Sequence, residues 1–523
     1  MESSHPIQTI LKDEIKPKLL PYQHAHADNI AYTIQRYGRA LDLSQTGTGK
    51  SYVSSAVCAS LNLKPLVICP KSLVTMWPRV FKEFGLESYG VANYEMLQNG
   101  NYVVKGVVKK CPYIKRVDVS PEDKNTIEND YKSKKEQDGT YTTFVWNDLP
   151  SDMILIFDEA HRCKNPRTFN SMLLHNASET DVRILLLSAT LADKPDTFAL
   201  PAFVLRLVES TRKAKDWIHH LGKGYSNIMS GVHDVLFPEY ASRMRSRDVK
   251  GLFPDNKIVA DCFEMENAKE IEEQYQIIEE EINKLKTKEE SSDCVLAKIL
   301  YARMRIEQLK IPTFIRLTKE HLDNGNSVAL FVNFTDTLKT LKSELGTTCI
   351  IYGQQTMEER DRSIRLFNED KERVIICNIR SGGVGISLHD TIGDYPRVSI
   401  ISPSWSAQDI LQVLGRIHRA NGKTPVEQKI VFCKGTIEER ICENMSEKIS
   451  NIAQLNDGDL LSHQIEGLNT KEEEKKKEEP NELGKLFLRM ETLQARKARL
   501  LQELKQAEDE LKEVEKCIEN CIQ

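Results

Sequence analysis

The sequence lacks the features that assign many proteins to a class at first sight. Its 12 cysteines include no CxxC pair and no cluster with histidine at zinc-ligand spacing, which argues against a zinc module. We interpret the thiols as reduced and structural, with Cys163, Cys377 and Cys433 packing as small apolar groups. No run approaches the roughly 18 apolar residues of a membrane span, and the stretch MESSHPIQTI has neither a basic nor an apolar signal region. We expect an intracellular, soluble protein that does not contact membranes.

An excess of positive charge is also missing. The chain has 72 Lys and Arg against 77 Asp and Glu, and its formal net charge of -5 excludes a polycationic packer of nucleic acid. The balance still allows a local basic groove, so charge neither indicates nor excludes a nucleic-acid partner. With 523 residues, of which 40% are apolar, the chain can bury two or three cores.

Short apolar runs of β-type occur in two sets. Because these runs are apolar on both faces, they are typical of parallel sheets that helices cover on each side. The first set comprises 39–43, 65–70, 153–157 and 183–187, and the second comprises 327–332, 349–353, 373–378, 397–402 and 428–433. We therefore predict an α/β protein with two parallel-sheet domains in tandem.

Changes in composition mark the expected domain limits. The expected segments are a first domain over 1–260 with a charged surface insertion at about 106–147, a helical bridge over 261–325 that leads into the second domain, the second domain over 326–450, a charged linker over 451–481, and a C-terminal segment over 482–523. In the last segment apolar residues recur at three- and four-residue steps, which predicts a coiled-coil helix that meets a protein partner or a second copy. An amphipathic helix docked on its own chain is the alternative.

The stretch LSQTGTGKS, residues 43–51, is similar to a phosphate-binding loop without its first glycine, whose place Ser44 takes. It follows an apolar run and precedes a helical pattern, and this strand–loop–helix context is what a phosphate cradle needs. Gly47 and Gly49 allow backbone N–H groups to turn toward a β-phosphate. Lys50 next to them predicts neutralisation of the β- and γ-phosphate oxygens.

Two consecutive carboxylates follow the apolar run at 153–157. Asp158 can reach the water shell of Mg²⁺, which the Ser51 hydroxyl can also hold, and Glu159 can orient and deprotonate an attacking water. Alone, the stretch DEAH could be a charged helix start. Combined with the glycine–lysine loop upstream, it predicts an enzyme that hydrolyses a nucleotide phosphate with Mg²⁺.

These stretches together resemble the motifs of superfamily 2 helicases and translocases, most closely the Swi/Snf group. In that superfamily the first glycine of the loop is commonly replaced by a small residue. The matching stretches occur in the family's order: KLLPYQ (18–23), SQTGTGKS (44–51), LVICPKSLVTMWPRVFKEF (66–84), VANYEML (91–97), DEAHRCKN (158–165), FVNFTDTL (331–338), GQQTMEERDRSIRLFN (353–368), IRSGGVGISL (379–388) and QDILQVLGRIHRANGKTPVEQKIVFCKGTIEERI (408–441). The resemblance implies two RecA-like domains with ATP bound between them.

The resemblance also implies the residues of that site. The implied ATP-binding set is Gln23 at the adenine edge, the loop residues Ser44, Gln45, Thr46, Gly47, Thr48, Gly49, Lys50 and Ser51, and His161 and Gly385. Gln412, Arg416 and Arg419 would face the ATP from the second domain. An arginine supplied in this way stabilises the charge on the transferring phosphoryl group, so hydrolysis would depend on closure of the two domains.

The nucleic-acid contacts are less sharply marked. The resemblance implies that Lys71, Ser72 and the stretch 379–388 touch backbone phosphates, in binding that depends on salt and is largely blind to sequence. Residues 109–116 and 243–250 are candidate basic patches. A solvated charged face is the simpler interpretation of each.

Three functions stay open at this point. The leading expectation is movement along duplex DNA, with or without unwinding. The stretch LLLSATLADKP (185–195) has SAT where most Swi/Snf members have a TGT-like variant, which favours a strand-separating helicase on RNA or single strands in transcription. The third is a coiled-coil scaffold with a weak ATPase switch. The compact chain also resembles helicase-like ATPases of large cytoplasmic DNA viruses, so we expect it in the nucleus or cytoplasm, or in a viral factory or virion.

Lys50→Ala and Glu159→Gln should each abolish ATP turnover. The first change removes the charge that faces the phosphates, and the second removes the base that activates water. Because Glu159→Gln leaves the phosphate cradle intact, that variant should still bind ATP. The rate of ATP hydrolysis and the equilibrium binding of nucleotide measure the two effects. A Glu159→Gln protein with full activity would remove the role given to Glu159.

Overall fold

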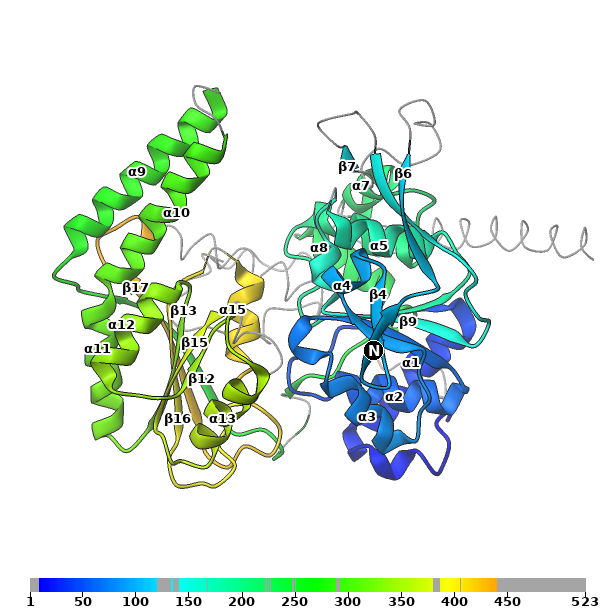
Figure 1. Cartoon of the computed structure of the whole chain (residues 1–523), viewed down its shortest axis with the longest axis horizontal. Helices are drawn as coiled ribbons and strands as arrows, with labels where there is room; N and C mark the ends of the chain where they lie inside the picture. The colour runs from blue at the N-terminus through cyan, green and yellow to red at the C-terminus, as the bar shows by residue number, and fades with distance from the viewer. Residues whose placement is uncertain are drawn as a thin grey trace, which may run out of the picture.

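A computed structural model shows two α/β lobes side by side (Figure 1). We call them lobe one and lobe two in chain order. The structure describes residues 9–119, 133–134 and 141–439, except 167, 222, 224, 226, 247, 248, 250, 288–291, 380–385 and 405. The predicted linker (451–481) and coiled coil (482–523) lie outside the described residues.

Lobe one is built on an eight-stranded sheet with the order β11-β1-β10-β9-β2-β3-β4-β5. Six of its strands are parallel: β1 (Arg39–Asp42), β2 (Lys64–Cys69), β3 (Gly90–Asn93), β9 (Met153–Asp158), β10 (Arg183–Leu187) and β11 (Ala241–Ser242). The hairpin of β4 (Asn101–Val104) and β5 (Val107–Lys110) extends the edge with antiparallel pairing.

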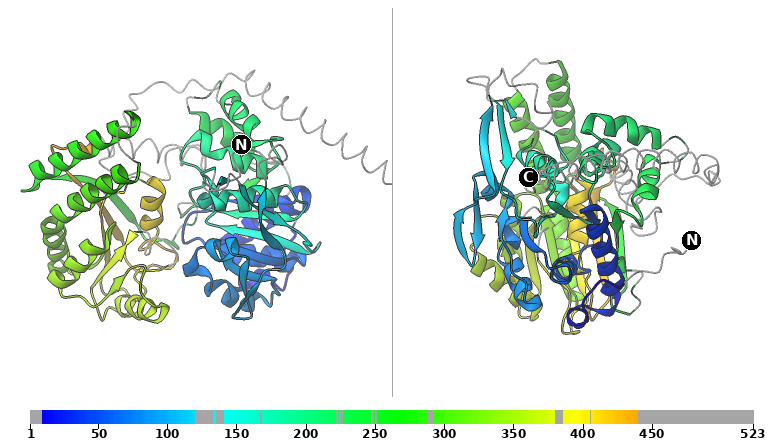
Figure 2. Two further views of the ribbon diagram at one scale, coloured as in Figure 1. Left: turned by 45° about the horizontal axis from the view of Figure 1, so that its top comes forward. Right: turned by 90° about the vertical axis from the view of Figure 1, so that its right-hand side faces the viewer.

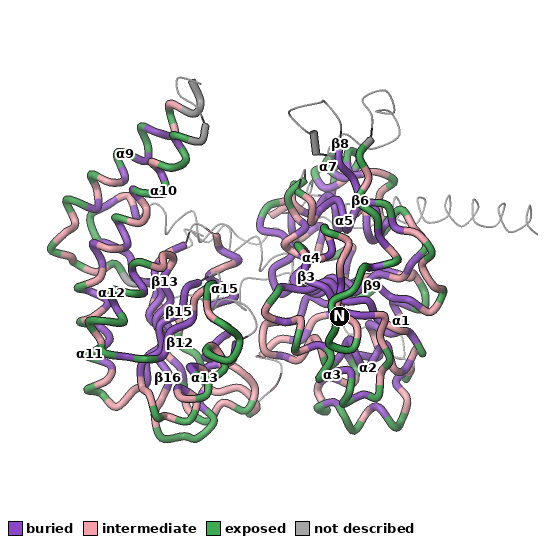
Figure 3. The backbone as a smooth tube through the Cα atoms, viewed as in Figure 1, coloured by how far each residue is buried: buried purple, intermediate pink, exposed green. Residues whose placement is uncertain are grey.

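Helices cover both faces of this sheet. The helices on one face are α1 (His24–Tyr37), α2 (Lys50–Leu61) and α3 (Met76–Phe84), and those on the other are α4 (Tyr94–Gln98), α5 (Phe169–Ser178), α6 (Ala199–Val204), α7 (Thr211–Leu221) and α8 (Ile228–Leu236). Each face of the sheet packs into its own hydrophobic core, and alternate side chains of β9 point to the two faces. Ile154 and Ile156 pack on one side, and Leu155 and Phe157 pack on the other. This double burial explains why the central strands are apolar along their whole length (Figure 3).

The described part of the charged insertion at about 106–147 contains regular strands, which its composition does not predict. Strands β6 (Ile114–Val119), β7 (Ser133–Lys134) and β8 (Tyr141–Trp146) form a three-stranded antiparallel sheet. Phe144 and Trp146 are buried, and the indole N–H of Trp146 donates to the carbonyl oxygen of Leu173 on α5 at 3.0 Å. The segment is therefore anchored to the core of lobe one through a few aromatic residues that the charged sequence around them obscures.

Lobe two is built on a six-stranded sheet with the order β12-β17-β16-β13-β15-β14, in which all pairs are parallel. Its strands are β12 (Asn256–Phe263), β13 (Ser327–Val332), β14 (Ile350–Ile351), β15 (Val374–Asn378), β16 (Arg397–Ile401) and β17 (Val426–Cys433). Helices α11 (Ile311–Asp323) and α12 (Thr335–Leu345) cover one face, and α13 (Met357–Asn368) and α15 (Ala407–Leu414) cover the other. The prediction of two tandem parallel-sheet domains is confirmed.

The expected domain limit at 260/261 and the expected bridge both need correction. β12 pairs with β17, so the chain enters lobe two near residue 256. Helices α9 (Ala268–Thr287) and α10 (Ser292–Leu309) form a hairpin that projects from lobe two instead of linking the lobes (Figure 2). Helical periodicity predicted that the segment is helical, but it could not show on which lobe the apolar face would pack.

Cys163, Cys377 and Cys433 are buried and free, as predicted. Burial raises the pKa of Cys163 to about 12, which keeps this thiol neutral. Within the described part of the chain, no helix has the combined length and apolar character that crossing a bilayer would need.

A buried ion pair fastens the hairpin to lobe two. Lys310 precedes α11, and its ammonium contacts the carboxylate of Glu438, with both side chains at most 2% exposed. The hydroxyl of Tyr275 on α9 donates to the other oxygen of Glu438 at 2.8 Å, and the backbone N–H of Cys433 also donates to this carboxylate. One carboxylate therefore joins α9, the start of α11 and the end of β17.

Lys310→Met should lower the free energy of unfolding of lobe two by about 3 to 5 kcal/mol, because it leaves Glu438 buried without a counter-charge. Replacing both partners, in Lys310→Met with Glu438→Leu, should recover much of this loss. Lys434→Met is the matched control, since Lys434 pairs with Glu264 at the surface and should change stability by less than about 1 kcal/mol. Urea unfolding of the three variants measures the difference. Equal effects of Lys310→Met and Lys434→Met would contradict the stabilising role of the buried pair between Lys310 and Glu438.

Candidate active site

The glycine-rich loop lies between β1 and α2. Gly47 and Gly49 have φ angles of 84° and 94°, a region that glycine adopts without steric cost. A Cβ atom added at Gly49 would lie only 2.3 Å from Nε2 of Gln23. Helix α2 begins at Lys50, so its first free N–H groups lie at the loop. Backbone angle and space both require glycine, as they do in a phosphate cradle.

Ser44 occupies the place of the missing first glycine and is fully buried. Its Oγ accepts a hydrogen bond from the backbone N–H of Met244 at 2.9 Å and lies 3.2 Å from Nε2 of His26. Its backbone N–H donates to Oδ1 of Asp42 at 2.9 Å. A glycine could not make the side-chain contacts. The hydroxyl thus ties the loop to α1 and to the segment that follows β11.

Lys50 lies over the loop. Its Nζ donates to the carbonyl oxygens of Ser44 at 2.8 Å and Gln45 at 3.3 Å. Burial lowers the pKa of Lys50, while the negative charges of Glu159 and Asp42 oppose that shift. Ser51, the second residue of α2, is half-buried beside it.

Gln23 lies behind the loop with both ends of its amide engaged. Its Nε2 donates to the carbonyl oxygen of Thr48 at 2.8 Å, and its Oε1 accepts from the backbone N–H of Leu20 at 2.9 Å. The hydroxyl of Tyr22 also donates to the carbonyl of Thr48, at 3.1 Å. These contacts make Gln23 a brace of the loop, and its predicted contact with adenine stays a prediction.

The two consecutive carboxylates lie at the carboxyl end of β9, next to the loop. Glu159 has a left-handed backbone with φ 55° and ψ 50°, which is uncommon for a residue with a side chain and often found at functional sites. Burial and the charge of Glu159 raise the pKa of Asp158. Burial also opposes ionisation of Glu159, but His161, Lys50 and Arg416 outweigh it and lower the pKa of this carboxyl. The ionised pair therefore depends on cationic neighbours.

His161 and Gln412 connect this pair to lobe two. Nδ1 of His161 lies 3.2 Å from Oε2 of Glu159 and 3.2 Å from the hydroxyl of Ser188. Gln412, on α15, places its Nε2 3.3 Å from Oε2 of Glu159 and 3.2 Å from Nε2 of His161. A residue predicted from the second domain therefore reaches the carboxylate predicted to be the base.

Arg416 and Arg419 follow α15 and are directed to the same place. Burial lowers the pKa of Arg416 to about 10, and the nearby charge of Glu159 opposes this. Burial and the charge of Arg416 lower the pKa of Arg419 to about 9. The side chain of Arg419 lies against the glycine loop: its Cγ is 3.2 Å from where a Cβ of Gly47 would be. Both guanidiniums donate to the carbonyl oxygen of Ile386.

This set of groups fits ATP with a divalent metal ion. The adjacent carboxylates of Asp158 and Glu159 carry more negative charge than Lys50 alone balances, and oxygen ligands of this type suit Mg²⁺. Nε of Arg419 is a buried donor without a hydrogen-bond partner in the described part of the chain. A polyphosphate would supply acceptors for the two guanidiniums. Of the residues predicted to form the ATP site, Gly385 alone lies outside the described residues.

Two aromatic side chains that the motifs did not single out hold Asp158. The indole N–H of Trp77 donates to Oδ2 of Asp158 at 3.0 Å, and the hydroxyl of Tyr94 donates to the backbone carbonyl of Asp158 at 2.9 Å. Both lie in stretches that resemble family motifs. A buried aromatic residue in an apolar stretch is read as core, and the direction of its polar end is known only after folding.

The candidate basic patches differ in burial. Lys109 and Lys110 lie on β5, whose four residues are exposed, in keeping with a solvated face. Arg243 instead donates to the carbonyl oxygen of Leu43, directly behind the glycine loop. The second patch is therefore at least partly a support of the loop. Lys71 and Ser72 form a short turn after β2 that is exposed or half-buried.

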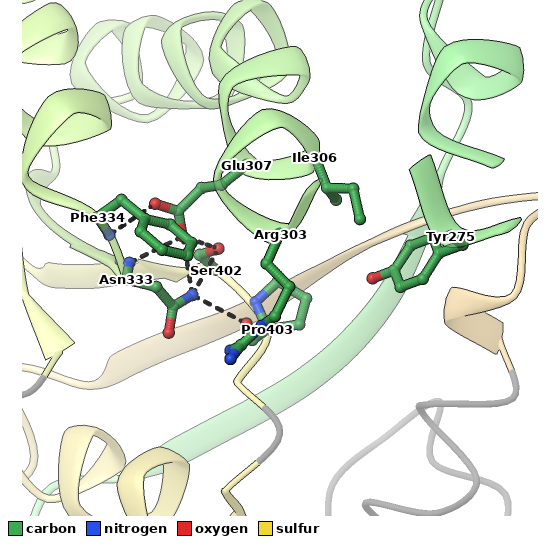
Figure 4. Close-up of a pocket in the computed structure, with 8 residues that line it drawn as sticks. All are labelled: Tyr275, Arg303, Ile306, Glu307, Asn333, Phe334, Ser402 and Pro403. Carbon is green, nitrogen blue, oxygen red and sulfur yellow. Dashed lines mark hydrogen bonds between the residues drawn. The ribbon is translucent and has the colours of Figure 1, made fainter. Parts of the chain in front are cut away.

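A polar pocket at the base of the hairpin is separate from this site and shares none of its residues (Figure 4). Glu307 of α10 accepts hydrogen bonds from the backbone N–H groups of Asn333 at 2.8 Å and Phe334 at 2.9 Å, and from the hydroxyl of Ser402 at 2.6 Å. Its carboxylate is thus fully engaged at the ends of β13 and β16. The pocket is a structural joint between the hairpin and the sheet.

Known families and proteins match this architecture. Residues 16–193 match the family model described as type III restriction enzyme, res subunit, and residues 309–421 match the helicase conserved C-terminal domain. A protein of Acanthamoeba polyphaga mimivirus, provisionally named an ATP-dependent RNA helicase, is 36% identical over 490 residues, covering 88% of this chain and 87% of its own. The chain belongs to the superfamily 2 helicases.

More distant relatives extend the comparison. The human SWI/SNF-related matrix-associated actin-dependent regulator of chromatin subfamily A member 1 is 24% identical over 73% of this chain. The helicase spans only 38% of that protein's length. Among solved structures, it matches S. cerevisiae Dbp5 bound to RNA and ADP BeF3 with 14% identity and a TM-score of 0.42, over 87% of this chain and 94% of the other. The family assignment identifies an ATP-dependent, nucleic-acid-dependent enzyme.

Gly415→Ala should prevent the two lobes of the helicase from meeting. A Cβ at Gly415, at the end of α15, would lie 1.7 Å from Oγ1 and 2.7 Å from Cβ of Thr46 in the glycine loop. The clash lies between lobes, so we expect ATP hydrolysis to fall at least about 10-fold, as misplacement of a catalytic group does, while the melting temperature stays unchanged. Adding Thr46→Gly should restore part of the rate relative to Thr46→Gly alone. Undiminished hydrolysis by Gly415→Ala would contradict the contact.

Proposed function

We propose that this helicase binds ATP and Mg²⁺ between its lobes and uses hydrolysis to move along duplex DNA. The observation that carries the proposal is the meeting of lobe two with the nucleotide site of lobe one. Gly415 lies against Thr46, Arg419 lies against Gly47, and Gln412 reaches Glu159. Groups needed for one reaction are thus divided between two lobes, so movement of the lobes and hydrolysis are coupled.

The proposed roles of the residues follow from their positions. Gly47, Gly49 and the start of α2 bind the phosphates through backbone N–H groups, and Lys50 neutralises their oxygens. Ser51 and Asp158 would hold Mg²⁺, which, when bound, neutralises charge on the β- and γ-phosphates. Trp77 and Tyr94 orient Asp158 through the hydrogen bonds described above.

Glu159 is the proposed base that takes a proton from the attacking water. Its lowered pKa keeps it ionised, and His161 and Gln412 fix the direction of its carboxylate. Arg416 and Arg419 stabilise the charge that develops on the phosphoryl group, an effect worth on the order of 10³ to 10⁵ in rate for an arginine supplied from another element. Since both arginines belong to lobe two, hydrolysis requires that the lobes are closed.

The choice of nucleic acid is the open part of the proposal. Duplex DNA is favoured by the Swi/Snf-like stretches at 66–84 and 158–165, together with the human chromatin-regulating relative. An RNA or single-strand helicase is the second candidate, since the mimivirus relative is named an RNA helicase and the SAT stretch is typical of strand separation. A scaffold that meets partners through residues 482–523, with weak ATP turnover, is the third. We place the protein in the nucleus or cytoplasm, or in a viral factory if it is viral.

A panel of nucleic acids separates these candidates. ATP hydrolysis is measured with duplex DNA, single-stranded DNA and RNA of equal length at several salt concentrations, alongside strand displacement on matched duplexes. We expect duplex DNA to stimulate hydrolysis most, with stimulation falling as salt rises because phosphate contacts release counterions. Greater stimulation by RNA, accompanied by displacement, would favour the second candidate. No stimulation by any of the three would overturn the proposal and favour the scaffold.

A further inference from the structure

Three polar side chains outside the predicted ATP set meet between the lobes. Lys164 and Asp193 belong to lobe one, and Gln408 belongs to α15 of lobe two. Nζ of Lys164 lies 3.1 Å from both carboxylate oxygens of Asp193 and 2.5 Å from Oε1 of Gln408. Nε2 of Gln408 donates to the backbone carbonyl of Thr190 at 2.8 Å. Both ends of one lobe-two amide are therefore bonded to lobe one.

These side chains are shielded from solvent. The side chains of Lys164 and Asp193 are 17% and 10% exposed, and Gln408 is 4% exposed. An ion pair in such surroundings is screened much less than a surface pair, and a hydrogen bond from a charged donor is stronger than one between neutral groups. The contacts can therefore favour one arrangement of the lobes over another.

Each of the three residues lies only a few positions along the chain from a residue at the predicted ATP site. Lys164 comes directly after the short helix Ala160–Cys163 that follows Glu159. Asp193 comes after the SAT stretch, in which the hydroxyl of Ser188 contacts His161. Gln408 and Gln412 are four residues apart on α15 and so lie on the same face of the helix. The cluster therefore adds a second set of contacts between the lobes, next to the contact between Gln412 and Glu159.

The two kinds of contact respond differently to opening. Lys164 and Asp193 belong to the same lobe, so their ion pair persists when the lobes separate. Gln408 leaves with lobe two, and Lys164 then loses its third acceptor. The ion pair between Lys164 and Asp193 is thus formed before closure, and the hydrogen bond from Lys164 to Gln408 forms only when the lobes close.

We propose that Lys164, Asp193 and Gln408 form a latch that stabilises the closed arrangement of the lobes. The latch holds α15 in the register at which Gln412 reaches Glu159. Its members are positioning residues that act through α15, with no contact to ATP required. The inference rests on the proposed function for its effect on hydrolysis, but its effect on closure can be measured without hydrolysis.

The test compares full-length variants of the latch. Gln408→Leu removes both hydrogen bonds at nearly constant volume, and Lys164→Met removes the charge. Lys164→Arg retains the charge and donors, and serves as the conservative variant. Lys371→Met is the matched control, because Lys371 forms an exposed ion pair with Glu369 on lobe two.

Hydrolysis gives the first readout. Gln408→Leu and Lys164→Met should each lower kcat in the presence of nucleic acid by about 10- to 100-fold, the range of one hydrogen bond to a charged group. Nucleotide affinity should fall by less than kcat does, since the glycine loop is untouched and only the closed arrangement is destabilised. The double variant should lose less than the product of the two single losses, because both changes remove the hydrogen bond between Lys164 and Gln408. Lys371→Met should match the wild type.

Closure gives the second readout. Small-angle scattering with AMP-PNP and Mg²⁺ should show compaction of the wild type, Lys164→Arg and Lys371→Met, and little compaction of Gln408→Leu. Wild-type compaction of Gln408→Leu, or independent losses that multiply in the double variant, would overturn the latch. A wild type that compacts but shows no hydrolysis stimulated by nucleic acid would instead overturn the proposed function and leave the latch supported.

Discussion

The site depends on balancing negative charge at the carboxyl end of β9. Asp158 and Glu159 are consecutive, buried and directed to one place, and neither burial nor their mutual repulsion favours two ionised groups. His161 in the turn after the strand lies 3.2 Å from Glu159, and positive charge comes from Lys50 in the glycine loop and from Arg416 of lobe two. The last of these requires the second lobe to be close. The electrostatics of one strand end thus create the need for two lobes.

This charge balance also requires the two lobes to approach each other closely. Small residues at the contact between the lobes allow that approach. An added Cβ at Gly415 would lie 1.7 Å from Oγ1 of Thr46, and one at Gly47 would lie 3.2 Å from Cγ of Arg419. The hydroxyl of Ser44 meanwhile holds the loop from behind, where a glycine would leave the loop less tightly tied. Variation from the usual phosphate-binding loop is therefore not a defect. It moves part of the support of the loop from backbone conformation to side-chain hydrogen bonds.

Lobe two has its own joints, which fasten the hairpin to the sheet on which α15 packs. Glu307 fastens the hairpin to the ends of β13 and β16 (Figure 4), and α15 is the next helix along the chain after β16. Glu438 fastens the same hairpin to α11 and β17. Carboxylates engaged by several donors recur at these joints, because a buried carboxylate is stable only when its oxygens are satisfied. The hairpin and α15 are consequently both attached to the sheet of lobe two.

The sequence by itself determined the fold class and predicted most of the residues that the structure brings together at the candidate nucleotide site. Apolar runs on both faces predict parallel strands, and the loop at 44–51, the pair Asp158–Glu159 and the arginines after α15 are recognisable because their chemistry depends on local order along the chain. Only the tertiary structure decided what meets across space: the limit of lobe two at β12, the lobe on which α9 and α10 pack, the bonds from Trp77 and Tyr94 to Asp158, and the joining of Lys164, Asp193 and Gln408. Periodicity and motif spacing describe neighbours along the chain. The direction in which a buried polar group points depends on partners far apart in sequence, and packing alone sets that direction.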